Sequence, residues 1–174
     1  MQLLRAVDVS AQERRVLCNH PAVLNRCSSR NMAERSVMES NLPIQGGCLC
    51  GAVRYGAWGK AYGVTHCHCQ TCRRASGAPF VTWAGFDTDK FSFTRGQPAS
   101  YASSRHVLRS FCSQCGTALT YRRLDLPGSI DVTLCSMDAP EAIKPEDHTW
   151  TESRLSWVEL CDQLPTYPQE RKSL

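Results

Sequence analysis

Thiols and imidazoles crowd into one short stretch of this 174-residue chain, where residues 66–72 read HCHCQTC. No hydrophobic core requires that density of sulfur and nitrogen. Two cysteine pairs flank the stretch, Cys48 with Cys50 before it and Cys112 with Cys115 after it. Cysteine and histidine side chains at such spacings are typical zinc ligands. We therefore predict that these clusters bind zinc and that the rest of the chain is the scaffold that brings them together.

The C-x-x-C pair, Cys112 and Cys115, is the most specific of the three signals. In a zinc knuckle of this kind the backbone turns tightly, and Gly116 would supply the positive φ that the turn often requires. A redox C-x-x-C normally opens a helix in a βαβ unit, whereas a strand-like run at 118–121 follows here. We therefore interpret this pair as metal ligands.

A closed structural zinc site needs four ligands, so the C-x-x-C pair requires two more. Joining it with Cys69 and Cys72 gives an ordinary two-knuckle ribbon. Joining it with the C-x-C pair leaves Cys67, Cys69 and Cys72 as an independent trio, and three protein ligands with an open position are the pattern of a catalytic zinc. The trio could also form a second closed site with His66 or His68. The spacing alone leaves these alternatives open.

The scaffold consists of short apolar runs separated by glycine and proline. The runs predicted as strands are 52–55, 64–67, 80–84, 91–93, the region of Tyr101, 107–111, 118–121 and 130–134. Several short strands at about ten-residue spacing are typical of an all-β or mainly β domain. We expect a mainly antiparallel β domain with little helix, in which Trp83 and Phe80 belong to the core.

We divide the chain into an N-terminal extension (1–42), a zinc domain (43–168) and a C-terminal tail (169–174). Residues 1–41 contain six Arg and four acidic residues and show no sustained apolar periodicity. We expect the extension to be loosely ordered and to make few contacts with the domain. Its acidic residues make a mitochondrial transit peptide the weaker alternative to a cytoplasmic location.

Composition excludes several classes of protein. Eleven cysteines, an odd number at C-x-C and C-x-x-C spacings, argue against a secreted disulfide framework and favour a reducing compartment. The sequence contains no run of 18 apolar residues, so we expect no membrane span. The net charge of +4 comes without a basic stripe carrying interleaved aromatics, so nucleic acid is not an expected partner. The charge does suit an anionic small substrate, and oligomeric state is not predicted.

Four motifs in order carry a resemblance to a known family. They are GGCLCGAVRY at 46–55, CHCQTCRR at 67–74, SGAPF at 76–80 and FCSQCGT at 111–117. Over about residues 43–168 the chain resembles the glutathione-dependent formaldehyde-activating enzyme family, also called the centromere protein V family. The resemblance implies an Mss4-like fold, which is rich in β structure, with two zinc ions per chain.

The same resemblance assigns ligands and an activity. It implies a structural zinc held by Cys48, Cys50, Cys112 and Cys115. It implies a zinc at the active site held by Cys67, Cys69 and Cys72. It also implies a carbon–sulfur lyase that joins glutathione and formaldehyde into S-hydroxymethylglutathione. The alternative is a non-catalytic zinc module that binds a protein partner.

The chemistry of the trio fits a small thiol substrate. Three thiolates on Zn²⁺ give a net charge of about −1, so the ion would be a weak Lewis acid and acidify bound water poorly. Its better use is to bind a fourth thiolate and hold it ready to attack a carbonyl. Arg73 and Arg74 could pair with a substrate carboxylate, although surface statistics favour a solvated basic face.

The remaining candidates have plain structural expectations. We expect His66 and His68 to form hydrogen bonds within their own loop. The four cysteines without a partner at metal spacing are expected to be buried and inert. They are Cys18, Cys27, Cys135 and Cys161.

Overall fold

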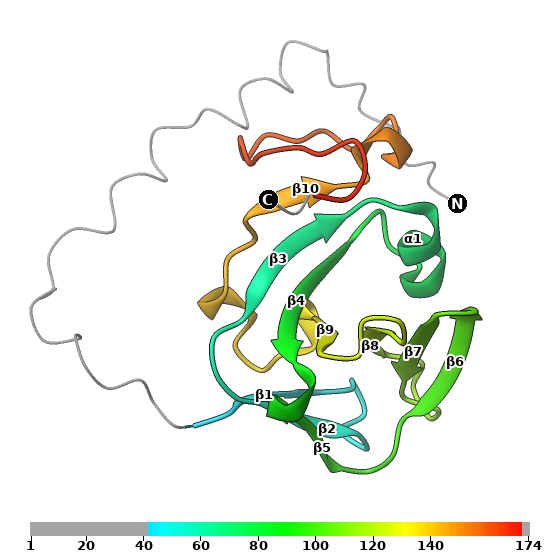
Figure 1. Ribbon diagram of the computed structural model, residues 1–174, viewed down its shortest axis with the longest axis vertical. Helices are drawn as coiled ribbons and strands as arrows, with labels where there is room; N and C mark the ends of the chain where they lie inside the picture. Colours follow the sequence, from blue (N-terminus) through cyan, green and yellow to red (C-terminus); the bar gives the residue numbers. More distant parts are fainter. Residues whose placement is uncertain (1–41, 172–174) are drawn as a thin grey trace, which may run out of the picture. The chain divides into compact units, whose positions relative to one another are not determined.

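The computed structural model describes residues 42–171, so residues 1–41 of the predicted extension and residues 172–174 of the tail lie outside it. Within the described range the chain forms ten strands, one α-helix and four short 3₁₀ turns (Figure 1). The prediction of a mainly β domain with little helix is confirmed. No helix in the described range has the length and apolar character needed to cross a membrane.

The strands form two sheets. The smaller sheet is antiparallel and consists of β1 (Ile44–Gly47), β2 (Arg54–Ala57) and β5 (Phe91–Arg95), in that order. The larger sheet has the order β10 (Asp147–Thr149), β3 (Tyr62–Cys67), β4 (Val81–Asp87), β9 (Ser129–Thr133), β8 (Ala118–Arg123), β7 (Val107–Phe111) and β6 (Ala99–Ser104). All of its pairings are antiparallel except β10 with β3.

The helix α1 (Gln70–Ser76) follows β3 directly and leads back into β4 (Figure 1). It ends at Gly77, whose φ of 67° allows its N–H to donate to the carbonyl of Arg73. The 3₁₀ turns are Thr88–Lys90, Leu134–Ser136, Pro140–Ala142 and Thr151–Ser153. The helix therefore belongs to the loop that carries the cysteine trio.

The main core lies between the two sheets. Tyr55 from the smaller sheet is fully buried with Phe86, Leu119 and Val132 from the larger one. Gly46 in β1 permits this packing, because a Cβ atom there would lie 2.2 Å from the Tyr55 hydroxyl oxygen. Two of the four residues of β1 are glycine, so no apolar run marks this strand in the sequence, and the prediction missed it for that reason.

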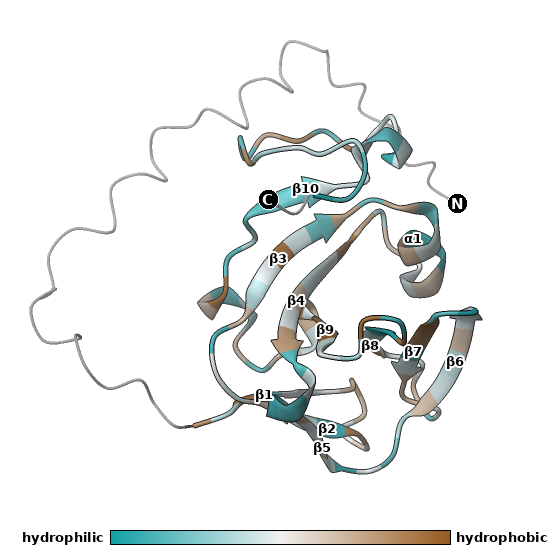
Figure 2. Ribbon diagram, viewed as in Figure 1, coloured by the Kyte–Doolittle hydropathy of each residue, from teal (hydrophilic) through white to brown (hydrophobic). Residues whose placement is uncertain are grey.

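Strand β10 was also missed, because its three residues are polar. Figure 2 shows β10 in hydrophilic colours. Asp147, His148 and Thr149 are nevertheless buried, since β10 pairs with β3 on one side and the C-terminal segment lies against it. Tyr167 donates its N–H to the His148 carbonyl, and His148 donates its N–H to Pro165. The closing segment of the domain thus covers the edge of the larger sheet.

One face of the larger sheet carries a continuous row of polar and aromatic side chains. Residues directly opposite each other in paired strands share a face, as do alternate residues along one strand. The pairings Thr65 with Trp83 and Gly85 with Asp131 join β3, β4 and β9. The pairings of Tyr121 with Asp131 and with Arg109 extend the row across β8 and β7. Cys67, two residues beyond Thr65, lies on this same face.

Candidate metal centres

The four thiols of the flanking pairs come together at one end of the main core. The sulfurs of Cys48, Cys50, Cys112 and Cys115 all lie within 4.8 Å of one another. The Cys50 sulfur is 3.5 Å from that of Cys48 and 3.7 Å from that of Cys112. A tetrahedron with zinc–sulfur bonds of about 2.3 Å has sulfur–sulfur edges of about 3.8 Å. The arrangement therefore fits one tetrahedral zinc ion.

Both flanking pairs lie on tight turns that end in glycine. The Gly51 N–H donates to the Cys48 carbonyl, and the Gly116 N–H donates to the Cys112 carbonyl, each at 2.9 Å. Gly51 has a φ of 72° and Gly116 a φ of 75°, which glycine adopts without strain. A Cβ atom at Gly116 would meet nothing within 4 Å. The glycine is thus required by backbone conformation, and the predicted positive φ is confirmed.

Thr117 links the two turns. Its hydroxyl accepts a hydrogen bond of 3.1 Å from the Leu49 N–H, and its oxygen lies 3.2 Å from the Cys115 sulfur. This side-chain contact is the largest of the effects that lower the pKa of Cys115 to about 5. The thiolate form of Cys115 is therefore favoured, which is the form that binds a metal.

The trio gathers where β3 leads into α1. The sulfurs of Cys67, Cys69 and Cys72 lie within 4.8 Å of one another. Cys67 ends β3, while Cys69 is the N-cap of α1 and accepts a hydrogen bond of 3.3 Å from the Cys72 N–H. Hydrogen bonds with Cys67 and Cys72 lower the pKa of Cys69, whereas contacts with Cys69 and Cys72 raise that of Cys67. Cys69 is thus the thiol of this group that ionises first.

The neighbouring histidines point away from the trio. The His66 Nδ1 lies 2.8 Å from the Thr82 hydroxyl on β4, and the His68 Nε2 lies 2.9 Å from the His148 Nδ1 on β10. Alternation along β3 explains this, because Cys67 and its two neighbours face opposite sides. The expectation of hydrogen bonds within the loop was wrong, since both partners belong to other strands. The arrangement gives no support to either imidazole as a fourth ligand.

His148 connects the histidine group to Asp162, whose carboxylate accepts a hydrogen bond of 2.9 Å from the His148 Nε2. The His148 Nδ1 lies 2.9 Å from the His68 Nε2, and the buried His68 Nδ1 has no hydrogen-bond partner among the described residues. Burial lowers the pKa of His68 to about 4, so the ring is neutral. Sequence reasoning missed His148 and Asp162 because neither lies near the clusters in the chain.

Two cavities adjoin the trio. One of about 620 Å³ is lined by Cys72 and α1 on one side and by β6 and β7 on the other. The second, of about 520 Å³, is lined by all three cysteines of the trio together with Trp83 and Tyr121. Both volumes fall in the range of small-molecule sites, about 300–1,000 Å³. An ion bound by the trio would therefore face a space that can hold a substrate.

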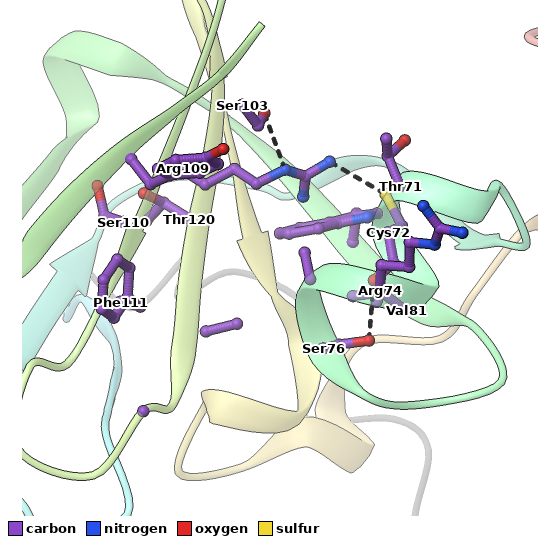
Figure 3. A pocket seen from close by; sticks show the side chains of 15 residues that line it. Thr71, Cys72, Arg74, Ser76, Val81, Ser103, Arg109, Ser110, Phe111 and Thr120 are labelled. Carbon is purple, nitrogen blue, oxygen red and sulfur yellow. Dashed lines mark hydrogen bonds between the residues drawn. The ribbon is translucent and has the colours of Figure 1, made fainter.

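Arg109 lines both cavities, and Figure 3 shows its side chain reaching toward Cys72 in the larger one. Its Nη2 lies 3.6 Å from the Cys72 sulfur, and its Nε donates to the Ser103 hydroxyl at 3.2 Å. The guanidinium carbon lies 4.9 Å from the centre of the Tyr121 ring. These contacts fix a positive charge beside the trio. Sequence reasoning missed Arg109, because it lies 37 residues from Cys72 on a different strand.

The remaining candidates have mixed outcomes. Arg73 donates to the carbonyls of His68 and Ser153, so it holds the loop in place, while Arg74 lines the larger cavity. Trp83 is buried as expected but also lines both cavities. The side chains of Cys135 and Cys161 are exposed, so the prediction that they are buried was wrong. Cys18 and Cys27 lie outside the described residues.

Comparison with known proteins finds sequence relatives and similar solved structures. An uncharacterized lyase from Schizosaccharomyces pombe is 36% identical over 78 residues, which are 44% of this chain and 56% of the relative. A putative glutathione-dependent formaldehyde-activating enzyme from Halomonas elongata is 28% identical over 126 residues, 67% of this chain and 80% of the relative. A crystal structure of a Rhodobacter sphaeroides protein aligns with a TM-score of 0.47 and 21% identity, covering 71% of this chain and 99% of that one.

The family assignment depends on a longer match. This chain spans little more than half the length of the Schizosaccharomyces pombe lyase, which therefore says little about the whole protein. The family model for the glutathione-dependent formaldehyde-activating enzyme matches residues 43–153, which include all seven clustered cysteines. The resemblance carried by the four sequence motifs is confirmed. The chain belongs to the glutathione-dependent formaldehyde-activating enzyme family.

Proposed function

We propose that this protein is a zinc-dependent carbon–sulfur lyase that adds a thiol, with glutathione as the leading candidate, to formaldehyde or a related aldehyde. The observation that carries the proposal is the trio of thiols in the wall of a cavity of about 520 Å³. Three protein ligands leave a fourth position for a substrate atom. The family and its lyase-named relatives support the same class of reaction.

We assign the two groups of thiols different roles. The structural zinc would be bound by Cys48, Cys50, Cys112 and Cys115, whose sulfurs fit a closed tetrahedron. The second zinc would be bound by Cys67, Cys69 and Cys72. When bound there, zinc lowers the pKa of a substrate thiol that takes its open position.

The reaction itself is an addition. The thiol sulfur forms a bond to the carbonyl carbon of the aldehyde, the carbonyl π bond breaks, and the thiol proton passes to the oxygen. Arg109, held by Ser103 and by the Tyr121 ring, keeps a positive charge beside Cys72 and offsets the charge of the thiolates. Trp83 gives both cavities part of an apolar wall.

The test measures metal content and zinc-edge X-ray absorption with and without glutathione. We expect about two zinc ions per chain in the unaltered protein and additional sulfur scattering when glutathione is supplied. Cys69→Ala should keep the fold and one zinc but lose the second zinc and the activity with formaldehyde. Cys135→Ala, an exposed thiol outside the clusters, is the matched control. A spectrum unchanged by saturating glutathione, with imidazole scattering at the second site, would favour the non-catalytic zinc module instead.

A further inference from the structure

The cavity beside the trio contains a carboxylate that the proposed chemistry does not use. Asp131 lies on the same face of the larger sheet as Cys67 and lines the cavity of about 520 Å³ together with the trio. Within residues 42–171 its carboxylate has no hydrogen-bond or ion-pair partner. Asp131 is half-buried in the cavity wall, and a partly desolvated carboxylate without a partner is costly, so this one calls for an explanation.

Two tyrosines lie close to this carboxylate. Tyr121 pairs with Asp131 on one side, and Gly85 pairs with it on the other. The Tyr62 ring lies over Gly85, since a Cβ atom there would be 2.9 Å from that ring. Burial is the main reason that the pKa values of both tyrosines are raised, and the charge of Asp131 adds to the effect in each. The same shielding from water raises the pKa of Asp131 to about 6.

The cations that line this cavity are already committed to other groups. Arg109 contacts Cys72, Ser103 and the Tyr121 ring. Arg171 forms an ion pair with Asp147 and donates to the Val64 carbonyl. The missing counter-charge of Asp131 is therefore best supplied by a ligand. An ammonium group suits such a site for two reasons. The carboxylate neutralises its charge, and aromatic rings attract a cation.

The register of the sheet also limits the shape of that ligand. Cys67 pairs with Val81 and Asp131 pairs with Gly85, so the two levels lie four residues apart along β4. Four residues of a strand correspond to about 13 Å, and the two interstrand steps from β3 through β4 to β9 add about 10 Å at right angles, so the two backbone positions lie about 16 Å apart. The two side chains and their contacts cover part of this span, so a molecule that contacts both the trio and Asp131 must carry its ammonium group on the order of 10 Å from its sulfur. Free cysteine is too short, whereas an extended peptide thiol with a free amino end has this length.

We propose that Asp131 binds the ammonium group of the thiol substrate and thereby selects peptide-like thiols with a free amine. This inference rests on the proposed function, because it assumes that the substrate sulfur lies at the trio. Asp131 would be a specificity-determining residue, and simple thiols would bind without its help.

The test is a thermodynamic cycle that combines removal of the charged amino group of the substrate with removal of the Asp131 carboxylate. Affinities of glutathione and N-acetylglutathione are measured by calorimetry on the zinc-loaded protein, its Asp131→Asn and Asp131→Ser variants, and Asp89→Asn as the control. Asp89 is an exposed carboxylate of the same charge, on the turn after β4. We expect the unaltered protein and the control to prefer the free amine by about tenfold or more, as for other charge-assisted hydrogen bonds. Both Asp131 variants should lose this preference and bind N-acetylglutathione as the unaltered protein does.

Several outcomes would overturn the inference. A preference for the free amine that survives in both variants, or that is absent from the unaltered protein, refutes the role of Asp131. Equal weakening of glutathione, N-acetylglutathione and 2-mercaptoethanol would show that Asp131 acts on the fold or the reaction. Binding of 2-mercaptoethanol separates the two proposals. If that thiol binds but the amine is not recognised, the ammonium site fails alone, whereas no binding of any thiol refutes the proposed function as well.

Discussion

Replacing Asp131 by Asn should stabilise the substrate-free protein, and the gain should grow with pH. The pKa of this carboxyl rises from its ordinary value of 3.8 to about 6 because of burial. Each unit of pKa corresponds to about 1.4 kcal/mol, so the ionised carboxylate costs the fold about 3 kcal/mol at most. A substrate-binding group that destabilises the empty protein is a common trade between stability and function.

Proton binding determines whether the stability of the protein rises or falls with pH. Between pH 3.8 and about 6 the folded state retains a proton on Asp131 that the unfolded state has lost. The stability of the unaltered protein therefore falls as the pH rises through this window, and the full cost is present above pH 6. By the same linkage, about half of the cost, roughly 1.5 kcal/mol, develops between pH 5 and pH 7.5.

The assay is urea unfolding of the zinc-loaded proteins at fixed free zinc, from pH 5 to pH 7.5. The free energies of unfolding are compared between variants, so the pH dependence of zinc binding cancels. The difference between Asp131→Asn and the unaltered protein should rise across this range, while that for Asp89→Asn should stay flat. A flat difference for Asp131→Asn would show that the carboxylate is well solvated and needs no counter-charge from a ligand.

Three further predictions concern the metal centres. Gly116→Ala should destabilise the protein by about 1–2 kcal/mol in chemical unfolding, because its φ of 75° is unfavourable for alanine. The control is Gly128→Ala, since a Cβ atom at Gly128 would also meet nothing within 4 Å but its φ is not positive. The control should cost less than half as much, and equal costs would contradict this reasoning. Cys112→Ser should lose the structural zinc and much of the thermal stability, because zinc binding contributes directly to folding; an unchanged melting temperature after chelator treatment would show that the assignment is wrong. Arg109→Ala should weaken retention of the second zinc about tenfold in competition with a chelator, because it removes the positive charge beside Cys72; unchanged retention would place its role elsewhere.

The amino-acid sequence by itself determined the local features of this protein. Short apolar runs between glycine and proline predicted eight of the strands, and the run 107–111 matches the bounds of β7. The spacing of cysteines and the glycine at 116 predicted a tight turn with positive φ, which is observed. These predictions succeed because a turn or a strand depends on residues close together in the chain. The family, too, was identified from short motifs whose spacing is a property of the sequence.

Tertiary structure decided which distant groups meet. Spacing alone allowed the C-x-x-C pair to join either of two partners, and the fold brings Cys112 within 3.7 Å of Cys50 across 62 positions. Arg109 reaches Cys72, and Asp131 enters the same cavity, only because the register of four strands places them on one face. Register is set by packing of the whole sheet, and a shift of one residue would turn these side chains to the opposite face. No local pattern contains that information.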